Sequence, residues 1–167
     1  MWFKSTKHRN VWHLEFFMKN EQTNGHQFLC HSGGCEGSDI VWENECRKYG
    51  IKTISYSFYN HVCNGENPVM LSQTEIAEGY YACRKENKSL ARRFDDIMYP
   101  YVKNLLARNW FQVKNSDAVY AIGKFQNLKI VDGGTGWAVQ MAIDNKKPVY
   151  VFEQNSNAWF SYDYDRE

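Results

Sequence analysis

The segment LCHSGGCEGSDIVWENECRKYGIKTISYSF, residues 29–58, has the pattern of a strand, a turn, a helix and a second strand. A short apolar run stops at Gly33 and Gly34, and a third glycine, Gly37, follows before the amphipathic part of the segment. Residues 51–58 are a second run of strand-forming residues. A complete strand–helix–strand unit is therefore predicted within this segment.

The helix of this unit is predicted to begin at Ser38 and to end at Gly50. Ser38 is expected to cap it, and the carboxylate of Asp39 suits the positive end of the helix dipole. Apolar spacings of four and three residues assign the inward face to Trp42, Cys46 and Tyr49. The charged side chains are expected to point elsewhere: Glu43, Arg47 and Lys48.

The same order recurs toward the C-terminus. Residues 117–123 are a continuous apolar strand, and residues 129–152 combine a glycine-rich turn, a helix and a final strand. Between the two units, residues 72–85 are predicted to be helical, and Ser72 and Glu75 have the spacing of a capping box.

Residues 89–110 are also helical by their apolar period, and Pro100 must either kink this helix or begin a second one. Strands that alternate with helices and are apolar on both faces predict a parallel sheet covered on both sides. The predicted fold class is α/β, with an open, mainly parallel, doubly wound sheet flanked by helices in one domain, residues 1–167. Ligands of such sheets bind at the carboxyl ends of the strands, where both glycine turns fall.

The two ends of the chain are treated as extensions of this domain, residues 1–26 and 154–167. Residues 11–19 fit an edge strand or a short hairpin arm, and the Asn-Gly pair in residues 20–26 indicates a turn. The C-terminal extension has an aromatic cluster that could cover the sheet, mediate oligomerisation or flank the ligand site.

The composition of the chain disfavours several classes of partner. The formal net charge is +1, so no global field attracts DNA, RNA or acidic membranes. The N-terminus has no signal-peptide pattern and no apolar run has the length of a membrane span, so a cytoplasmic protein without membrane contact is expected. No CxxC pair is present, so zinc binding is weakly supported, and neither a metal nor a cofactor is predicted. Reduced thiols are expected for Cys30, Cys35, Cys46, Cys63 and Cys83.

Both glycine turns join an apolar strand to a helix, which exposes main-chain N–H groups at a helix N-terminus and favours an anion. Glycine also permits unusual backbone angles and lets a phosphate approach the backbone. One such turn fits packing as well as phosphate binding, but two in one small sheet favour a shared phosphate or ribose pocket. The chain lacks G-x-G-x-x-G and GK[ST], which argues against an ordinary NAD dehydrogenase and against a P-loop NTPase.

Two motifs carry a resemblance to a known family. HSGGCEGSD, residues 31–39, resembles the SGGAxGxD turn of the YspA-like branch of the SLOG superfamily. GGTGWAVQ, residues 133–140, is similar to the second SLOG signature, which is GGxGTxxE in the lonely-guy phosphoribohydrolases. Residues 107–123 resemble the strand-entry region of YspA-like proteins, and the likeness extends over about residues 27–153.

This resemblance implies a Rossmann-like domain that binds nucleotides or nucleotide-derived ligands. Members of the superfamily include cytokinin-activating phosphoribohydrolases, the DNA-uptake protein DprA, and sensor domains for cyclic ADP-ribose-type signals in antiviral defence. Many are oligomeric, which makes a homo-oligomer plausible for this chain. By position, the resemblance assigns one lip of the pocket to Ser32, Gly33, Gly34, Gly37 and Asp39, and the other to Gly133, Gly134, Thr135 and Gly136.

The second motif departs from the phosphoribohydrolases, which have threonine and glutamate where this chain has Trp137 and Gln140. That glutamate is assigned to cleavage of the N-glycosidic bond. Glutamine keeps the shape and the hydrogen bonding but cannot act as a carboxylate base. A sensor or sequestering protein for a nucleotide-type ligand is therefore favoured, with a nucleoside-monophosphate phosphoribohydrolase as the alternative. The near-neutral charge disfavours a nucleic-acid-binding relative of DprA.

Several other side chains have two interpretations. Arg108 and Asn109 could reach a phosphate from the edge of the sheet, or could simply lie at a helix C-terminus. Arg92 and Arg93 are adjacent, so they cannot share one helical face. One of them could face the pocket, but solvated positions are expected for both. Trp137 could stack on a base or pack beside the glycine turn.

The acidic residues of the turns are equally ambiguous. Asp39 could bind a ribose hydroxyl, bind an arginine or stabilise the start of the helix, and Asp132 has a similar ambiguity. Glu36 and Asp39 leave room for substitute acid–base chemistry at the first turn. His31 is expected to be a hydrogen-bonded turn residue rather than a catalyst.

Overall fold

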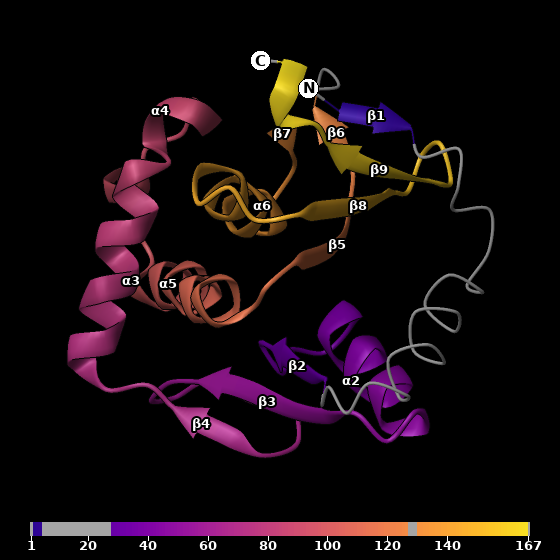
Figure 1. The fold of residues 1–167 in the computed structure, drawn as a ribbon. Coiled ribbons are helices and arrows are strands. Elements are labelled where there is room, and N and C mark those ends of the chain that lie inside the picture. Colours follow the sequence, from indigo (N-terminus) through magenta and orange to yellow (C-terminus); the bar gives the residue numbers. More distant parts are fainter. Residues whose placement is uncertain (1, 5–27, 127–129, 167) are drawn as a thin grey trace.

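The computed structural model describes residues 2–4, 28–126 and 130–166, and Figure 1 shows how their helices and strands are arranged. The strands are β1 (Trp2–Lys4), β2 (Leu29–Ser32), β3 (Lys52–Ser57), β4 (Pro68–Met70), β5 (Val119–Gly123), β6 (Phe125–Gln126), β7 (Ile130–Val131), β8 (Val149–Glu153) and β9 (Ala158–Tyr162). The helices are α2 (Ser38–Lys48), α3 (Gln73–Lys85), α4 (Asn87–Leu90), α5 (Pro100–Asn115) and α6 (Thr135–Asp144), with 3-10 turns η1 (Phe94–Asp96) and η2 (Tyr164–Arg166). The strand or hairpin arm expected at residues 11–19 and the turn expected at 20–26 lie outside the described residues.

The strands form two main sheets and a small hairpin. β2, β3 and β4 make a parallel sheet in that order, with Ser32 opposite Ser55. In the second sheet β5 and β8 are parallel, β9 pairs antiparallel with β8, and β1 pairs antiparallel with the other edge of β9. The hairpin is formed by β6 and β7. The chain is thus mixed α/β, with parallel pairing in both main sheets. Among the described residues β2 and β5 are not paired, so a single doubly wound sheet stays a prediction.

Helix α5 lies between the two sheets and positions the candidate site. It packs against β2, β3 and α6, and it makes its most extensive contact with α3. In Figure 1, β2 and β3 lie below α5 and α6 lies above it. The rings of Trp42 on α2 and Tyr120 on β5, whose centroids are 6.4 Å apart, also join the two halves.

Two apolar clusters hold the elements together. The larger one joins α3, α5, α6, β5 and β8, and its fully buried side chains include Phe94, Met141 and Val151. The smaller one, between β3 and α5, consists of Tyr56, Leu71 and Phe111. Burial of these side chains is the main favourable term in folding, at about 25 cal/mol per Å² of apolar surface.

Three local predictions are confirmed. The capping box at the start of α3 is formed, because the N–H of Glu75 donates to Ser72 Oγ and the N–H of Ser72 donates to Glu75 Oε2. Pro100 begins α5 as a second helix instead of kinking a longer one. Gly50, with a φ angle of +70°, follows the end of α2.

Helix α2 differs from the prediction in two respects. Its N-cap residue is Gly37 rather than Ser38. Glu43, which was expected to point away from the core, is only 1% exposed. Its carboxylate accepts hydrogen bonds from Ser55 Oγ at 2.8 Å and from the main-chain N–H of Glu66 at 3.0 Å. The prediction was wrong because apolar spacing cannot register a buried carboxylate whose partners come from other elements.

The aromatic C-terminal segment belongs to the sheet. β9 pairs with β8 and with β1, and Trp159 packs edge-on against Phe152 with ring centroids 5.6 Å apart. Of its three interpretations, covering and extending the sheet is the one observed. None of the described helices has the length and the hydropathy of a membrane span.

Glu86, the C-cap residue of α3, makes the stability of this fold depend on pH. Its side chain is buried, and burial, followed by a hydrogen bond to Asp144 and the charge of Asp144, raises its pKa to about 9. The folded protein therefore holds this proton more tightly than the unfolded chain, in which the pKa is near 4.5. The free energy of unfolding is then expected to fall as the pH rises from 4.5 toward 9.

Substitution Glu86→Gln should remove this dependence, because glutamine keeps a donor for Asp144 but has no titrating proton. Between about pH 5 and pH 8, we expect the wild type to lose about 4 kcal/mol more of its free energy of unfolding than E86Q. Urea unfolding followed by tryptophan fluorescence measures both. Glu45→Gln, at an exposed ion pair with Lys48, is the control and should keep the wild-type pH dependence. Equal pH slopes for E86Q and wild type would contradict the assignment.

Candidate functional site

The first glycine turn connects β2 to α2. Gly34 and Gly37 have φ angles of +64° and +101°, in the region that favours glycine. The N–H of Gly34 donates to Ser32 Oγ at 3.2 Å, and the N–H of Cys35 donates to Asp39 Oδ2 at 3.1 Å. The Asp39 carboxylate thus accepts a hydrogen bond from a main-chain N–H group of the kind that binds phosphates at helix N-termini.

Arg108 on α5 fastens this turn. Its side chain is 6% exposed, its Nη1 donates to the main-chain oxygen of Gly33 at 2.5 Å, and its Nη2 lies 3.8 Å from Asp39 Oδ2. A Cβ atom at Gly33 would overlap the guanidinium of Arg108 and the amide of Gln112, so glycine is required for this approach. Arg108 lies within α5 and not at its C-terminus, so the interpretation as a helix-terminal cation is wrong.

Asp39 makes the arginine contact that was one of its three interpretations. Burial raises the pKa of its carboxyl group, while the Arg108 guanidinium and the hydrogen bond from Cys35 act in the opposite direction. Asp39 also lies in the first turn of α2, where the helix dipole favours a negative charge. The first turn is therefore an electrostatically paired unit of one carboxylate and one guanidinium.

The loop after β3 closes over the first turn. The N–H of Asn64 donates to the main-chain oxygen of Gly34 at 2.8 Å. His61, from the same loop, has its Nδ1 2.9 Å from Ser57 Oγ and its Nε2 3.4 Å from Cys35 Sγ. Sequence reasoning did not pair Cys35 with His61, because no short motif connects the turn to this loop.

The second glycine turn connects β7 to α6. Gly133 has a φ angle of +64°, and its N–H donates to Asp132 Oδ1 at 2.8 Å, so a carboxylate occupies a main-chain donor here too. Arg92 donates through Nη1 to the main-chain oxygen of Gly133 at 2.9 Å, and its Nη2 lies 3.4 Å from Asp132 Oδ1. The solvated position expected for Arg92 is therefore wrong, whereas Arg93 is exposed as expected.

Asn109 connects the second turn to α5. Its Nδ2 donates to the main-chain oxygen of Gly134 at 3.3 Å. Arg108, the preceding residue of the same helix, holds Gly33 in the first turn. Successive residues of an α-helix point about 100° apart, so a single turn of α5 contacts both glycine turns on neighbouring sides. The two motifs, far apart in the chain, thus border one segment of α5.

The remaining residues of the second motif divide between packing and the surface. Gly136 is buried, and a Cβ atom there would overlap the main-chain oxygen of Val131. Trp137 is 4% exposed and packs edge-on against Phe94, with ring centroids 6.0 Å apart. The packing interpretation of Trp137 is therefore confirmed. Thr135, the first residue of α6, is half-buried.

Gln140 and His31 complete the set of predicted residues. Gln140 donates from Nε2 to Asp144 Oδ1 at 2.8 Å, toward the C-terminal end of α6 and away from the turn at its start. His31 lies with its Nδ1 3.1 Å from the hydroxyl oxygen of Tyr56, so it is hydrogen-bonded as expected. Glu36 is exposed.

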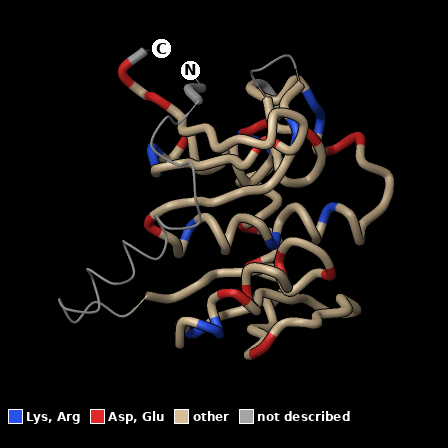
Figure 2. The backbone as a smooth tube through the Cα atoms, turned by 90° about the vertical axis from the view of Figure 1, so that its right-hand side faces the viewer, with Lys and Arg blue, Asp and Glu red and all other residues tan. Residues whose placement is uncertain are grey.

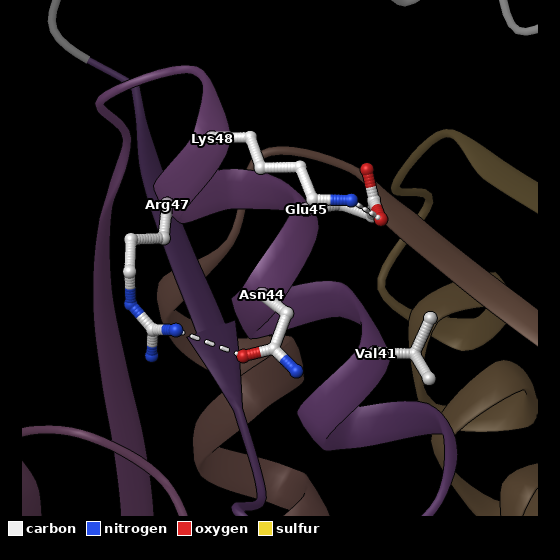
Figure 3. A pocket seen from close by; sticks show the side chains of 5 residues that line it. All are labelled: Val41, Asn44, Glu45, Arg47 and Lys48. Atoms are coloured by element: carbon white, nitrogen blue, oxygen red, sulfur yellow. Dashed lines mark hydrogen bonds and ion pairs between the residues drawn. The ribbon is translucent and has the colours of Figure 1, made fainter.

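The distribution of charge and a surface pocket on α2 can be compared with the positions of the two turns. In Figure 2 acidic and basic residues are interspersed along the tube. A surface pocket of about 480 Å³ lies on the outer face of α2, away from both turns. Figure 3 shows that its lining side chains pair with each other, Arg47 with Asn44 and Lys48 with Glu45. Across residues 2–4, 28–126 and 130–166, no cluster of His, Cys, Asp and Glu suits a metal ion.

Comparisons with known proteins give no relative from which a role could be transferred. No family model, no curated protein and no solved structure matches the chain. What this chain binds is therefore inferred from the geometry of its two glycine turns.

Proposed function

We propose that this chain is a SLOG-type, Rossmann-like module that binds a nucleotide or a nucleotide-derived ligand, such as a cyclic ADP-ribose-type signal, at its two glycine turns. It would act as a sensor or as a sequestering protein. The observation that carries the proposal is that Arg108 and Asn109, adjacent on α5, bind the main chain of Gly33 and of Gly134. In this proposal the two sheets correspond to the halves of one doubly wound sheet.

The anion preference of both turns supports the proposal. Each turn already binds a carboxylate through a main-chain N–H group, Asp39 at Cys35 and Asp132 at Gly133. We propose that phosphate oxygens of the ligand displace these carboxylates, because they accept the same hydrogen bonds and carry more charge. The displaced aspartates are then free to accept hydrogen bonds from ribose hydroxyl groups.

An exposed aromatic ring beside the first turn is suited to stack on a base. Tyr101 is 44% exposed and packs edge-on against Phe58, with ring centroids 5.6 Å apart. Phe58 in turn stacks on His61 at 5.0 Å, and His61 contacts Cys35 of the turn. Trp137, the aromatic residue that could have stacked on a base, is buried, so this proposal assigns base stacking to Tyr101.

Isothermal titration calorimetry against nucleoside mono- and diphosphates, ADP-ribose and cyclic ADP-ribose tests the proposal. We expect at least one of these to bind, and Asn109→Ala to weaken that binding about tenfold, which corresponds to about 1.4 kcal/mol. Asn109 is half-exposed and its contact with Gly134 is at the surface, so the variant should fold. Asn44→Ala, which removes an exposed asparagine from α2, is the control and should bind as the wild type does.

Two outcomes would contradict the proposal. One is the absence of binding across the whole panel, and the other is an affinity that N109A and N44A leave equally unchanged. Release of free base from a nucleoside monophosphate, measured in the same samples, would instead support the phosphoribohydrolase alternative.

A further inference from the structure

A thiol, an imidazole and a guanidinium from three different elements meet at the first glycine turn. Cys35 Sγ lies 3.4 Å from His61 Nε2 and 3.2 Å from Arg108 Nη1. Cys35 and His61 are half-buried, so small molecules can reach them, whereas Arg108 is 5% exposed. Among the described residues, the Nε of Arg108 is buried and has no hydrogen-bond partner, and the guanidinium bonds through its Nη atoms.

The contacts determine the tautomer of His61. Arg108 Nη1 lies 3.1 Å from His61 Nε2, and a guanidinium can only donate, so Nε2 must be the acceptor. The proton is then on Nδ1, which donates to Ser57 Oγ at 2.9 Å. Burial, followed by the charge of Arg108, lowers the pKa of His61 and keeps its imidazole neutral near pH 7. An unprotonated nitrogen therefore faces the thiol of Cys35.

The sulfur of Cys35 lies between a cation and an unprotonated ring nitrogen. The positive charge of Arg108 is nearest to the sulfur, and the imidazole of His61 accepts the proton that the sulfur loses. Asp39 is the acidic group of the cluster, but its carboxylate is paired with Arg108 Nη2 and with the N–H of Cys35. Transfer of the proton from Cys35 to His61 would leave the net charge of the three groups unchanged and would place the negative sulfur beside two cations.

We propose that Cys35 is a nucleophilic thiol that reacts with hydrogen peroxide or small organic peroxides, with His61 as its base. This modification site lies on the same glycine turn as the nucleotide ligand proposed above, but the reaction itself does not require that ligand. Acyl transfer is less well supported, because the N–H of the nucleophile, a common oxyanion donor, is already bonded to Asp39 at 3.1 Å. Attack on a peroxide needs only the thiolate and a proton donor for the leaving oxygen.

The step balances with peroxide as the oxidant. His61 Nε2 gives up the hydrogen bond from Arg108 Nη1 and takes the proton of Cys35. The thiolate attacks one peroxide oxygen, so an S–O bond forms as the O–O bond breaks. Sulfur is oxidised by two electrons to a sulfenic acid, and the peroxide is reduced. The leaving hydroxide takes the proton from His61 and departs as water.

A second thiol lies close to the reactive one. A Cβ atom at Gly34 would overlap Cys63 Sγ, so the sulfur of Cys63 reaches the backbone next to Cys35. A thiol attacks a sulfenic acid to form a disulfide and water. Cys63 is therefore the expected resolving cysteine, and Cys63→Ser should let the sulfenic acid of Cys35 accumulate.

Peptide mass spectrometry after brief exposure of the whole chain to hydrogen peroxide, with dimedone to trap sulfenic acids, tests the proposal. In the wild type we expect Cys35 to be modified before Cys30, Cys46 and Cys83, either as the dimedone adduct or as a disulfide with Cys63. His61→Gln should slow modification of Cys35 at least about tenfold. His31→Gln is the matched control, because His31 is also half-buried and hydrogen-bonded but does not contact the sulfur, and it should leave the rate unchanged.

Modification of Cys35 no faster than that of Cys30 and Cys46, which are also half-buried, would overturn the proposal, and this comparison needs only the wild-type protein. Equal rates for H61Q and H31Q would overturn the role of His61. Circular dichroism of both variants shows whether they are folded, so that a slow rate is not an effect of unfolding.

Discussion

Replacement of Arg108 by alanine is expected to lower the free energy of unfolding by about 3 kcal/mol and to abolish ligand binding at the first turn. The guanidinium is buried, and its removal leaves the main-chain oxygen of Gly33 without its donor. It also leaves the largely buried carboxylate of Asp39 without a counter-charge. A cavity replaces the side chain between α5 and the turn, which adds to the loss.

Arg93→Ala is the matched control for R108A. Arg93 is 77% exposed, and its ion pair with Asp96 is at the surface, so its loss should change the free energy of unfolding by less than about 0.5 kcal/mol. Urea unfolding followed by tryptophan fluorescence measures both variants. If R108A were as stable as R93A, the hydrogen bonds of Arg108 would not be what holds the first turn against α5.

Replacement of Gly136 by alanine is expected to destabilise the protein by about 3 kcal/mol, although alanine is the better helix former. The added Cβ would overlap the main-chain oxygen of Val131, and it would also lie 3.0 Å from the carbonyl carbon of Val131. Main-chain atoms cannot rotate away as a flexible side chain can. Relief of the overlap requires α6 to move from β7, which disrupts the second turn.

Gly134→Ala separates this steric effect from the general cost of losing a glycine in the same turn. Gly134 has an ordinary φ angle of −64°, and a Cβ atom there would meet only Leu106 Cδ2, at 3.6 Å. We expect G134A to lose less than about 1 kcal/mol. Thermal unfolding measured by circular dichroism ranks the two variants. Equal losses would show that the close approach of Gly136 to Val131 is not a constraint on the fold.

Short sequence patterns predicted the helices and strands, but they did not predict the contacts between segments that are far apart in the chain. The glycines, the capping box of Ser72 and the apolar periods act within a few residues, and they placed α2, α3, α5, α6 and the main strands. The helix predicted over residues 89–110 was wrong over residues 91–99, which contain only the 3-10 turn η1. Arg108 and Gly33 are 75 residues apart in the chain, and their contact depends on how α5 packs against β2. No pattern along the sequence records that packing.

The candidate site shows the same division. Both glycine turns were predicted from their own residues, and so was the possibility that Asp39 binds an arginine. The buried Glu43, the contact of Arg92 with Gly133 and the pair of Cys35 with His61 were missed. Each of these is a polar contact between separate elements, and amphipathic periodicity reports only where apolar side chains gather. For the contact of Arg92 with Gly133, one signal was present in the sequence: Arg92 and Arg93 are adjacent, so only one of the two could face the pocket.

If the two glycine turns form one ligand site across α5, a bound ligand must affect both turns. Titration of the ¹⁵N-labelled protein with ADP-ribose, followed by two-dimensional NMR, tests this most directly, because glycine amide signals lie in a well-separated region of the spectrum. We expect the amides of Gly34 and Gly37 and those of Gly133 and Gly134 to shift together, with one shared dissociation constant. Shifts confined to one turn, or no shift at either turn, would contradict a shared site.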